Sequence, residues 1–460
     1  MARGVADRHA EPRLRASDAR PHARRLGLFA CTAIVVGNMV GTGFYLAPAA
    51  MAPYGQLAIL TWIVMGAGAC CLGLTFARLA RIAPATGGPY AYTRMAYGGF
   101  AGFLVAWGYW ISIWTSLPVI ALAFTGSVMH AIPALESRSG AIGITLGAIW
   151  FAVLGNLRGV RTAGLWASVA TVAKLIPFGA IALLGLAYVR PEHLSTFNPS
   201  GQPLGAAFAA LAPITMFAFL GLESATVPAD HVHRPEKTIP RATLLGVMTA
   251  ALLYVLGTTV VLGVVPRDAL TGSPTPLADA ARLMWGPVGG VITTMAVNIS
   301  SMGALSGWAL LMGQVPMAAA RDGLFPAAFA RLSSRGVPAR ALLLSAVLAT
   351  ALALIEAADV SGFTGFYQRA IALSTAAAVI PYTLCALAPS LLVMPSSRAR
   401  RANGVTVVEA VAFVFALFTL YSCGPDAVLH ALLLLMAGIP IYAWGRRERL
   451  AQSPHHSFGL

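Results

Sequence analysis

The stretch VVGNMVGTGFYLAP, residues 35–48, decides the fold that we predict for this chain. It lies inside the first long apolar run, and Gly41 and Gly43 stand near the centre of that run. Glycine destabilises a helix interior by roughly 1 kcal/mol per position relative to alanine. Two glycines near the centre of a membrane-spanning helix therefore need an explanation, which must come from the rest of the sequence.

The composition indicates a chain embedded in a lipid bilayer. Hydrophobic residues make up 58% of its 460 positions and charged residues only 10%, whereas soluble domains carry about 25% charged residues. The five cysteines show no CxxC pair and no metal-ligand spacing, which predicts neither disulfides nor a zinc site. His231 and His233 lie in a predicted loop, and we interpret them as solvated loop residues and not as metal ligands. Because no hydrolase, nucleotide-binding or metalloprotease motif occurs, we expect no enzyme and no cofactor.

Apolar runs of membrane-spanning length predict twelve transmembrane helices with short connections and no separate soluble domain. They lie at 27–50, 56–79, 100–132, 140–157, 163–189, 205–229, 242–265, 285–319, 338–357, 363–394, 406–422 and 427–445. The first run follows an arginine-rich segment, so a cleaved signal peptide is the alternative there. Its length and the many spans behind it favour a retained helix.

The basic residues predict how the chain is oriented, because cytoplasmic loops carry an excess of lysine and arginine. With a cytoplasmic N-terminus, the inside segments hold 25 of the 31 lysines and arginines and the outside segments hold five. We therefore expect a multi-pass protein of the inner (plasma) membrane with both termini cytoplasmic. The net charge of +15 then reflects topology. Nucleic acid is not an expected partner, since the basic residues are scattered over loops without a binding motif.

Lys174 lies within the fifth predicted run, and Glu223 lies near the centre of the sixth. An ionisable residue in the bilayer interior is costly, and it indicates function by default. For Lys174 the alternative is that its long side chain reaches back to the cytoplasmic face. Glu223 is too far from either end of its run for that alternative.

The sixth run also has a weakened centre, the sequence GLESA at 221–225. Paired glycine-interrupted helices at matching positions of two halves are typical of inverted-repeat transporters whose site lies at the bilayer midplane. An interrupted helix frees N–H groups that suit a carboxylate and carbonyls that suit an ammonium group. This would explain Gly41 and Gly43, although close packing between helices is the alternative.

Four stretches carry a family resemblance. GNMVGTGFYLAP resembles the helix-one signature of the amino acid–polyamine–organocation superfamily, and FAFLGLESATV with RPEKTIPRAT resembles its sixth helix and following loop. ATGGPYAYTR resembles the loop after helix two, and GWALLMGQVPMAAARDGLFPAAFARLSSRGVPARA the region from helix eight to helix nine. Within the superfamily the chain is most similar to the basic amino acid–polyamine antiporters, including the arginine–agmatine exchanger.

The resemblance implies an all-α integral membrane fold of about twelve helices, with a LeuT-like 5+5 inverted-repeat core in which helices one and six are broken. It divides the chain into a cytoplasmic basic tail, a ten-helix core of two repeats, a pair of helices that commonly forms a homodimer contact, and a second cytoplasmic tail. The first tail is 1–26, and the core is 27–394, with its repeats at 27–189 and 205–394. The pair of helices is 406–445, and the second tail is 446–460.

The resemblance also implies roles for individual residues. Thr42 and Gly43, with Gly41, would bind the substrate carboxylate, and the carbonyls of Met39, Phe217 and Leu220 would receive its α-ammonium group. Trp308 would stack on the substrate side chain, Ser374 would meet its distal end, and Tyr109, Glu223 and Tyr382 would form a gate. Lys174 resembles a lysine that, in related permeases, takes the place of a sodium ion and takes part in proton coupling.

Three positions depart from the arginine exchanger. Leu117 stands where an asparagine meets the guanidinium group, Phe217 replaces a tryptophan, and Ile113 is bulkier than its counterpart. We therefore expect an amino acid/amine antiporter that works by alternating access, with a proton-coupled permease of neutral amino acids as the alternative that Leu117 and Lys174 favour. A non-transporting membrane sensor or assembly partner is the alternative from another class.

Overall fold

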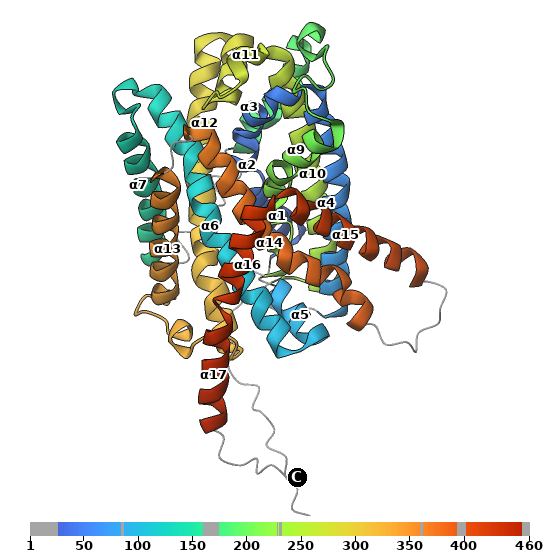
Figure 1. Cartoon of the computed structure of the whole chain (residues 1–460), viewed down its shortest axis with the longest axis vertical. Helices are drawn as coiled ribbons and strands as arrows, with labels where there is room; N and C mark the ends of the chain where they lie inside the picture. Colours follow the sequence, from blue (N-terminus) through green and yellow to red (C-terminus); the bar gives the residue numbers. More distant parts are fainter. Residues whose placement is uncertain are drawn as a thin grey trace, which may run out of the picture.

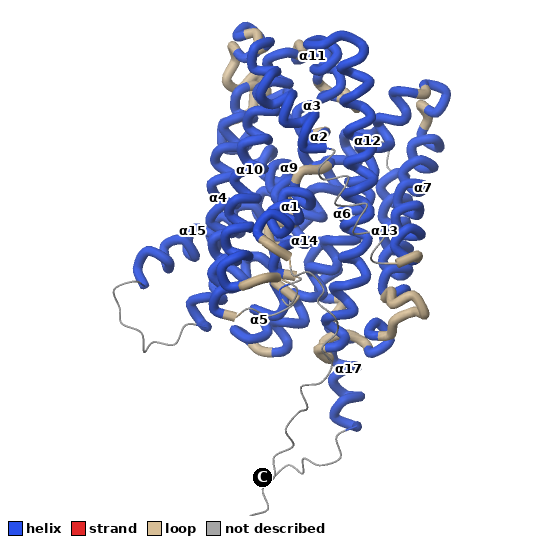
Figure 2. Tube along the Cα trace, turned by 180° about the vertical axis from the view of Figure 1, so that it is seen from behind, coloured by secondary structure: helices blue, strands red, loops and turns tan. Residues whose placement is uncertain are grey.

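The structure is a computed structural model that describes residues 26–83, 87–159, 174–227, 229, 232–358, 362–392 and 402–452. These residues form an elongated bundle of helices, with the short helix α11 (Arg267–Leu270) near one end and α5 (Pro89–Tyr97) near the other (Figure 1). Figure 2 shows the same bundle from behind, with loops between the helices. We refer to the two ends of the bundle as the α11 end and the α5 end.

Nine segments of the described chain are long and apolar enough to cross a membrane. They are α4 (Gln56–Ile82), α6 (Gly99–Ala131), α7 (Arg138–Leu157), α9 with η5 (Leu204–Phe219 and Ser224–Thr226), α10 (Pro235–Val264), α12 (Pro276–Arg321), α13 (Ala339–Ala358), α14 (Gly362–Leu392), and α16 with α17 (Pro425–Met436 and Ile439–Gln452). Three shorter apolar helices are α1 (Leu28–Met39), Lys174–Tyr188 and Val407–Ser422, the last within α15 (Ala402–Ser422). The predicted all-helical membrane fold is confirmed.

Glycines stand at the ends of helical segments in two of the predicted runs. The run expected at 285–319 matches the part of α12 that follows a kink at Gly286, whose φ of 73° lies in the left-handed region that favours glycine, and a helical stretch from Pro276 precedes the kink. The run expected at 427–445 is divided between α16 and α17. Gly438 lies between these two helices against the indole of Trp107, where a side-chain carbon would approach Nε1 to 2.7 Å. Glycine at 438 therefore lets the chain pass close to α6.

Helices one and six are interrupted where the glycines predicted it. α1 ends at Met39, Val40 is extended, and the short helix α2 (Thr42–Tyr45) then resumes the run ahead of α3 (Ala47–Met51). α9 ends at Phe219, Leu220 is extended, and Gly221 has a φ of 97°. A residue with a side chain is strained at such a φ, so glycine permits the second break.

The packing of the helices brings the two breaks into the centre of the bundle. α1 packs against α10 and η5, and α2 packs against α6 and α9. α6 packs in turn against α12 and α14, while α7 and α13 lie together at one edge (Figure 1). The walls around the breaks therefore include α6, α10, α12 and α14.

Candidate functional site

The two interrupted helices touch at their breaks. A side-chain carbon at Gly43 would lie 2.9 Å from Ala218 Cα and 2.9 Å from Phe217 Cδ1, closer than carbon atoms pack. Asn38 Nδ2 donates to Ser224 Oγ at 2.8 Å, and Ser224 Oγ donates to the Gly221 carbonyl at 2.5 Å. The absence of a side chain at Gly43 thus lets the two breaks come into direct contact, and the hydrogen bond between Asn38 and Ser224 links them.

Side chains from other helices satisfy backbone carbonyls that the breaks release. Lys174 is buried, and its Nζ donates to the Gly37 carbonyl at 2.6 Å and also to the Val40 carbonyl. Both carbonyls lie at the end of α1, beside the stretch of helix one that was predicted to unwind. Tyr254 Oη donates to the Ala218 carbonyl at 2.8 Å, which gives the second break a comparable partner. Hydrogen bonds from an ammonium group are among the stronger ones in proteins, so Lys174 holds the first break in place.

The Glu223 carboxylate lies fully buried just after the second break, between two tyrosines of other helices. Tyr109 Oη of α6 donates to one carboxylate oxygen at 2.6 Å, and Tyr382 Oη of α14 donates to the other. Phe76 of α4 contacts the Tyr382 ring edge to face, with ring centroids 5.4 Å apart. The structure therefore brings together the three residues for which the family resemblance implied a gate.

One face of α12 points at the first break. Along this face, Ser300 Oγ hydrogen-bonds with Tyr45 Oη, the Ala304 methyl group lies 3.8 Å from a carbon placed on Gly41, and Asn38 Oδ1 lies 3.5 Å from one placed on Gly307. Trp308 follows Gly307 directly, and its side chain is buried. Because residues three and four apart share a helix face, this spacing lines the site with α12 from Ser300 to Trp308.

The remaining predicted site residues, apart from Thr42, lie in the interior. Met39, Phe217, Leu220 and Leu117 are buried, and Phe217 also accepts the Leu220 N–H at 3.1 Å through its carbonyl. The Ser374 hydroxyl is fully buried and has no hydrogen-bond partner among the described residues. Thr42 begins α2, but its side chain lies outside the described part of the chain. A buried hydroxyl without a partner costs about 1–3 kcal/mol, so a ligand that bonds Ser374 recovers that energy.

Asn38, Ser224 and Tyr254, which contact each other or the breaks, were not named from the sequence as site residues. Asn38 and Ser224 are polar residues beside the glycines, a signal that was available but was not used. Tyr254 gave no signal, because a tyrosine in an apolar run is usually packing. Of the two loop histidines, His231 lies outside the described residues, and the His233 backbone N–H donates to the Leu26 carbonyl at 2.9 Å.

An all-helical membrane bundle whose two interrupted helices meet at its centre defines a secondary transporter. The crystal structure of MhsT in complex with L-phenylalanine shares this LeuT-like fold, with a TM-score of 0.59 at 15% sequence identity over 87% of this chain and 99% of that chain. A family described as amino acid permease matches residues 26–437. The chain belongs to this amino acid permease family and is a membrane transporter, not an enzyme.

Curated relatives are similar over most of their length. The putrescine transporter PotE of Escherichia coli K12 is 28% identical over 425 residues, which is 91% of this chain and 96% of the relative. The putrescine transporter PotE of Haemophilus influenzae is 27% identical over 424 residues, or 92% and 97%. The cadaverine/lysine antiporter of Escherichia coli K12 is 31% identical over 334 residues, or 72% and 75%.

Proposed function

We propose that this transporter exchanges a basic amino acid for an amine by alternating access at the two helix breaks. The contact between Gly43 and the backbone of Ala218 carries the proposal, since it joins the ends of both broken helices in one place. The relatives support the choice of substrate, because their names refer to putrescine and to cadaverine and lysine. The fold supports the mechanism, because transporters of this kind rock one bundle against the other around a central site.

We propose the following roles at the site. The N–H groups of Gly41, Thr42 and Gly43 face the substrate carboxylate, and the carbonyls of Met39, Phe217 and Leu220 accept its ammonium group. Trp308 stacks on the cationic side chain, and the unpaired Ser374 hydroxyl hydrogen-bonds its distal end. Leu117 offers no hydrogen bond to a guanidinium group, so arginine and agmatine are not the favoured substrates. Tyr109, Glu223 and Tyr382 close the site at the α5 end of the bundle.

We also propose that residues 27–394 form the transport core and that both termini lie on the cytoplasmic side of the inner membrane. The excess of basic residues in the inside segments supports this orientation. For 406–445 we propose a homodimer contact. Apolar side chains that are largely exposed, such as Val414 and Tyr421 on α15 and Leu433 on α16, support a contact with lipid or with a second copy.

A second candidate function is proton-coupled uptake of neutral amino acids. The burial of Lys174 between helix-one carbonyls favours it, because a proton that leaves and returns to this ammonium group would release and restore the break. The apolar side chain of Leu117, which the family resemblance assigns to the site, favours a neutral substrate.

Uptake by proteoliposomes separates these functions. Labelled lysine, ornithine, putrescine or cadaverine should enter only when the vesicles are preloaded with one of these compounds, and a proton gradient alone should drive no uptake. Uptake of neutral amino acids that depends on a proton gradient would instead establish the symporter. A folded protein that shows neither activity with this panel would contradict both candidate functions.

A further inference from the structure

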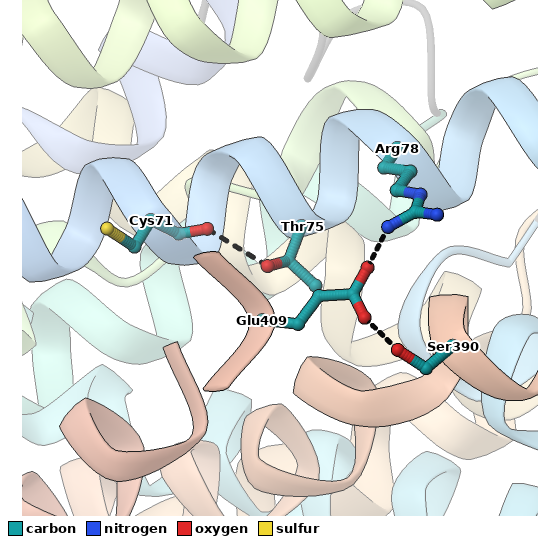
Figure 3. A network of polar contacts seen from close by, with 5 residues as sticks. All are labelled: Cys71, Thr75, Arg78, Ser390 and Glu409. Atoms are coloured by element: carbon teal, nitrogen blue, oxygen red, sulfur yellow. Dashed lines mark hydrogen bonds and ion pairs between the residues drawn. The ribbon is translucent and has the colours of Figure 1, made fainter. Parts of the chain in front are cut away.

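A second buried carboxylate lies outside the helix breaks. The Glu409 side chain of α15 is 1% exposed, and it joins two other helices (Figure 3). Arg78 Nη1 of α4 donates to one carboxylate oxygen, and Ser390 Oγ of α14 donates to the other. We call these three residues the Glu409 clamp. Each carboxylate oxygen has a partner on a different helix, so the clamp ties α4, α14 and α15 together.

The clamp joins α4 and α14, two helices that also touch at Tyr382 of the Glu223 gate. Tyr382 of the gate contacts Phe76, and Arg78 follows Phe76 by two residues on α4. Ser390 follows Tyr382 by eight residues on α14, which is about 12 Å along a helix. α4 also packs against α9 and α10, the two helices on either side of Glu223 in the chain. A movement of α14 that separates Tyr382 from Glu223 would also separate α14 from α4, and the clamp would oppose that movement.

The chemistry of the clamp suits a contact that forms and breaks. Replacing a buried ion pair with apolar residues of similar volume is often neutral or stabilising, so stability alone does not account for charges at this place. Removing one member of such a pair destabilises the folded protein, because the other charge is left buried and unpaired. Arg78 is 26% exposed, so it reaches water once the pair separates.

We propose that Glu409 is a positioning residue of the transport cycle. The clamp holds α14 against α4 while Tyr382 bonds Glu223, and it separates when the α5 end of the bundle opens. Glu409 acts through Tyr382 and does not touch the substrate. This role rests on the proposed gate at Glu223, so the two must be tested in the same experiment.

Cys385 provides a reporter that the chain already carries. It lies one helical turn beyond Tyr382 on α14, it is fully buried, and its Sγ contacts the Pro89 carbonyl at the start of α5 at 3.5 Å. Movement of α14 away from α5 exposes this thiol. N-ethylmaleimide added to proteoliposomes modifies exposed thiols, and peptide mass spectrometry distinguishes Cys385 from the other four cysteines.

We expect Glu409→Gln to raise the initial rate of Cys385 modification about tenfold, which corresponds to a shift of 1.4 kcal/mol between closed and open states. Ser390→Ala should give a smaller increase, because the ion pair remains. The matched control is Glu356→Gln, which removes the carboxylate paired with Arg369 at the other end of α14 at 3.2 Å. This control should label at the wild-type rate.

The outcomes separate the clamp from the gate. A wild-type labelling rate in Glu409→Gln, together with a raised rate in Glu223→Gln, would overturn the clamp and leave the gate standing. Wild-type rates in both variants would overturn both. An equal increase in Glu356→Gln would mean general loosening and would also overturn the clamp. If Glu409→Gln does not fold, the double variant Arg78→Gln/Glu409→Gln leaves no unpaired charge, and a wild-type rate there overturns the clamp equally.

Discussion

Replacing Gly43 by alanine tests the contact on which the proposed site depends. The added carbon would lie 2.9 Å from Ala218 Cα and 3.1 Å from Ala218 N, both backbone atoms of helix six that no side-chain rotation can move away. Overpacking of this kind typically costs 1–3 kcal/mol. If the substrate needs the two breaks in contact, that cost appears in binding, and the dissociation constant should rise between about 5-fold and 150-fold.

The measurement is equilibrium binding of labelled lysine or putrescine to the purified transporter, with size-exclusion chromatography to count folded protein. The control is Gly73→Ala, a buried helical glycine of α4 where the nearest atoms, on Thr243 and Val247, lie 3.5 Å away in ordinary contact. That variant should bind as the wild type does. A folded Gly43→Ala protein that binds within twofold of the wild type would refute the idea that both breaks form one binding site.

Three further predictions concern single side chains. Trp308→Ala should weaken binding of a cationic substrate by about 0.5–2 kcal/mol, measured by calorimetric titration; an equal loss for a neutral analogue would show that the indole only packs. Leu117→Asn should improve arginine or agmatine binding in the same titration, because it supplies a hydrogen-bonding partner for the guanidinium group, and unchanged affinity would place Leu117 outside the site. Lys174→Ala should abolish exchange by proteoliposomes, because the Gly37 and Val40 carbonyls lose their donor. Lys174→Arg should retain part of it, because arginine stays charged, and wild-type exchange by Lys174→Ala would contradict this role.

The sequence by itself determined that the chain lies in a lipid bilayer, that its fold is all-helical, and where two of its helices break. Runs of about twenty apolar residues have few stable forms in a bilayer other than helices, because every backbone polar group must find a partner within the protein. Glycines mark the breaks, since the chain needs close approach at Gly43 and a φ that a side chain resists at Gly221. Lys174 and Glu223 stood out because a charge in an apolar run is costly.

Other features depend on residues far apart in the chain, and local sequence carries no signal for them. Arg78 and Glu409 are 331 positions apart, and Gly438 between α16 and α17 lies against the indole of Trp107, a distant residue of α6. The partners of Glu223 were expected only through a family resemblance, because Tyr109 and Tyr382 resemble any other buried tyrosine in sequence. The composition of a helix reflects whether lipid or water surrounds it. Which side chains form hydrogen bonds or ion pairs depends instead on which helix faces become neighbours. Only the packed bundle therefore decided which charges are paired and which helices they join.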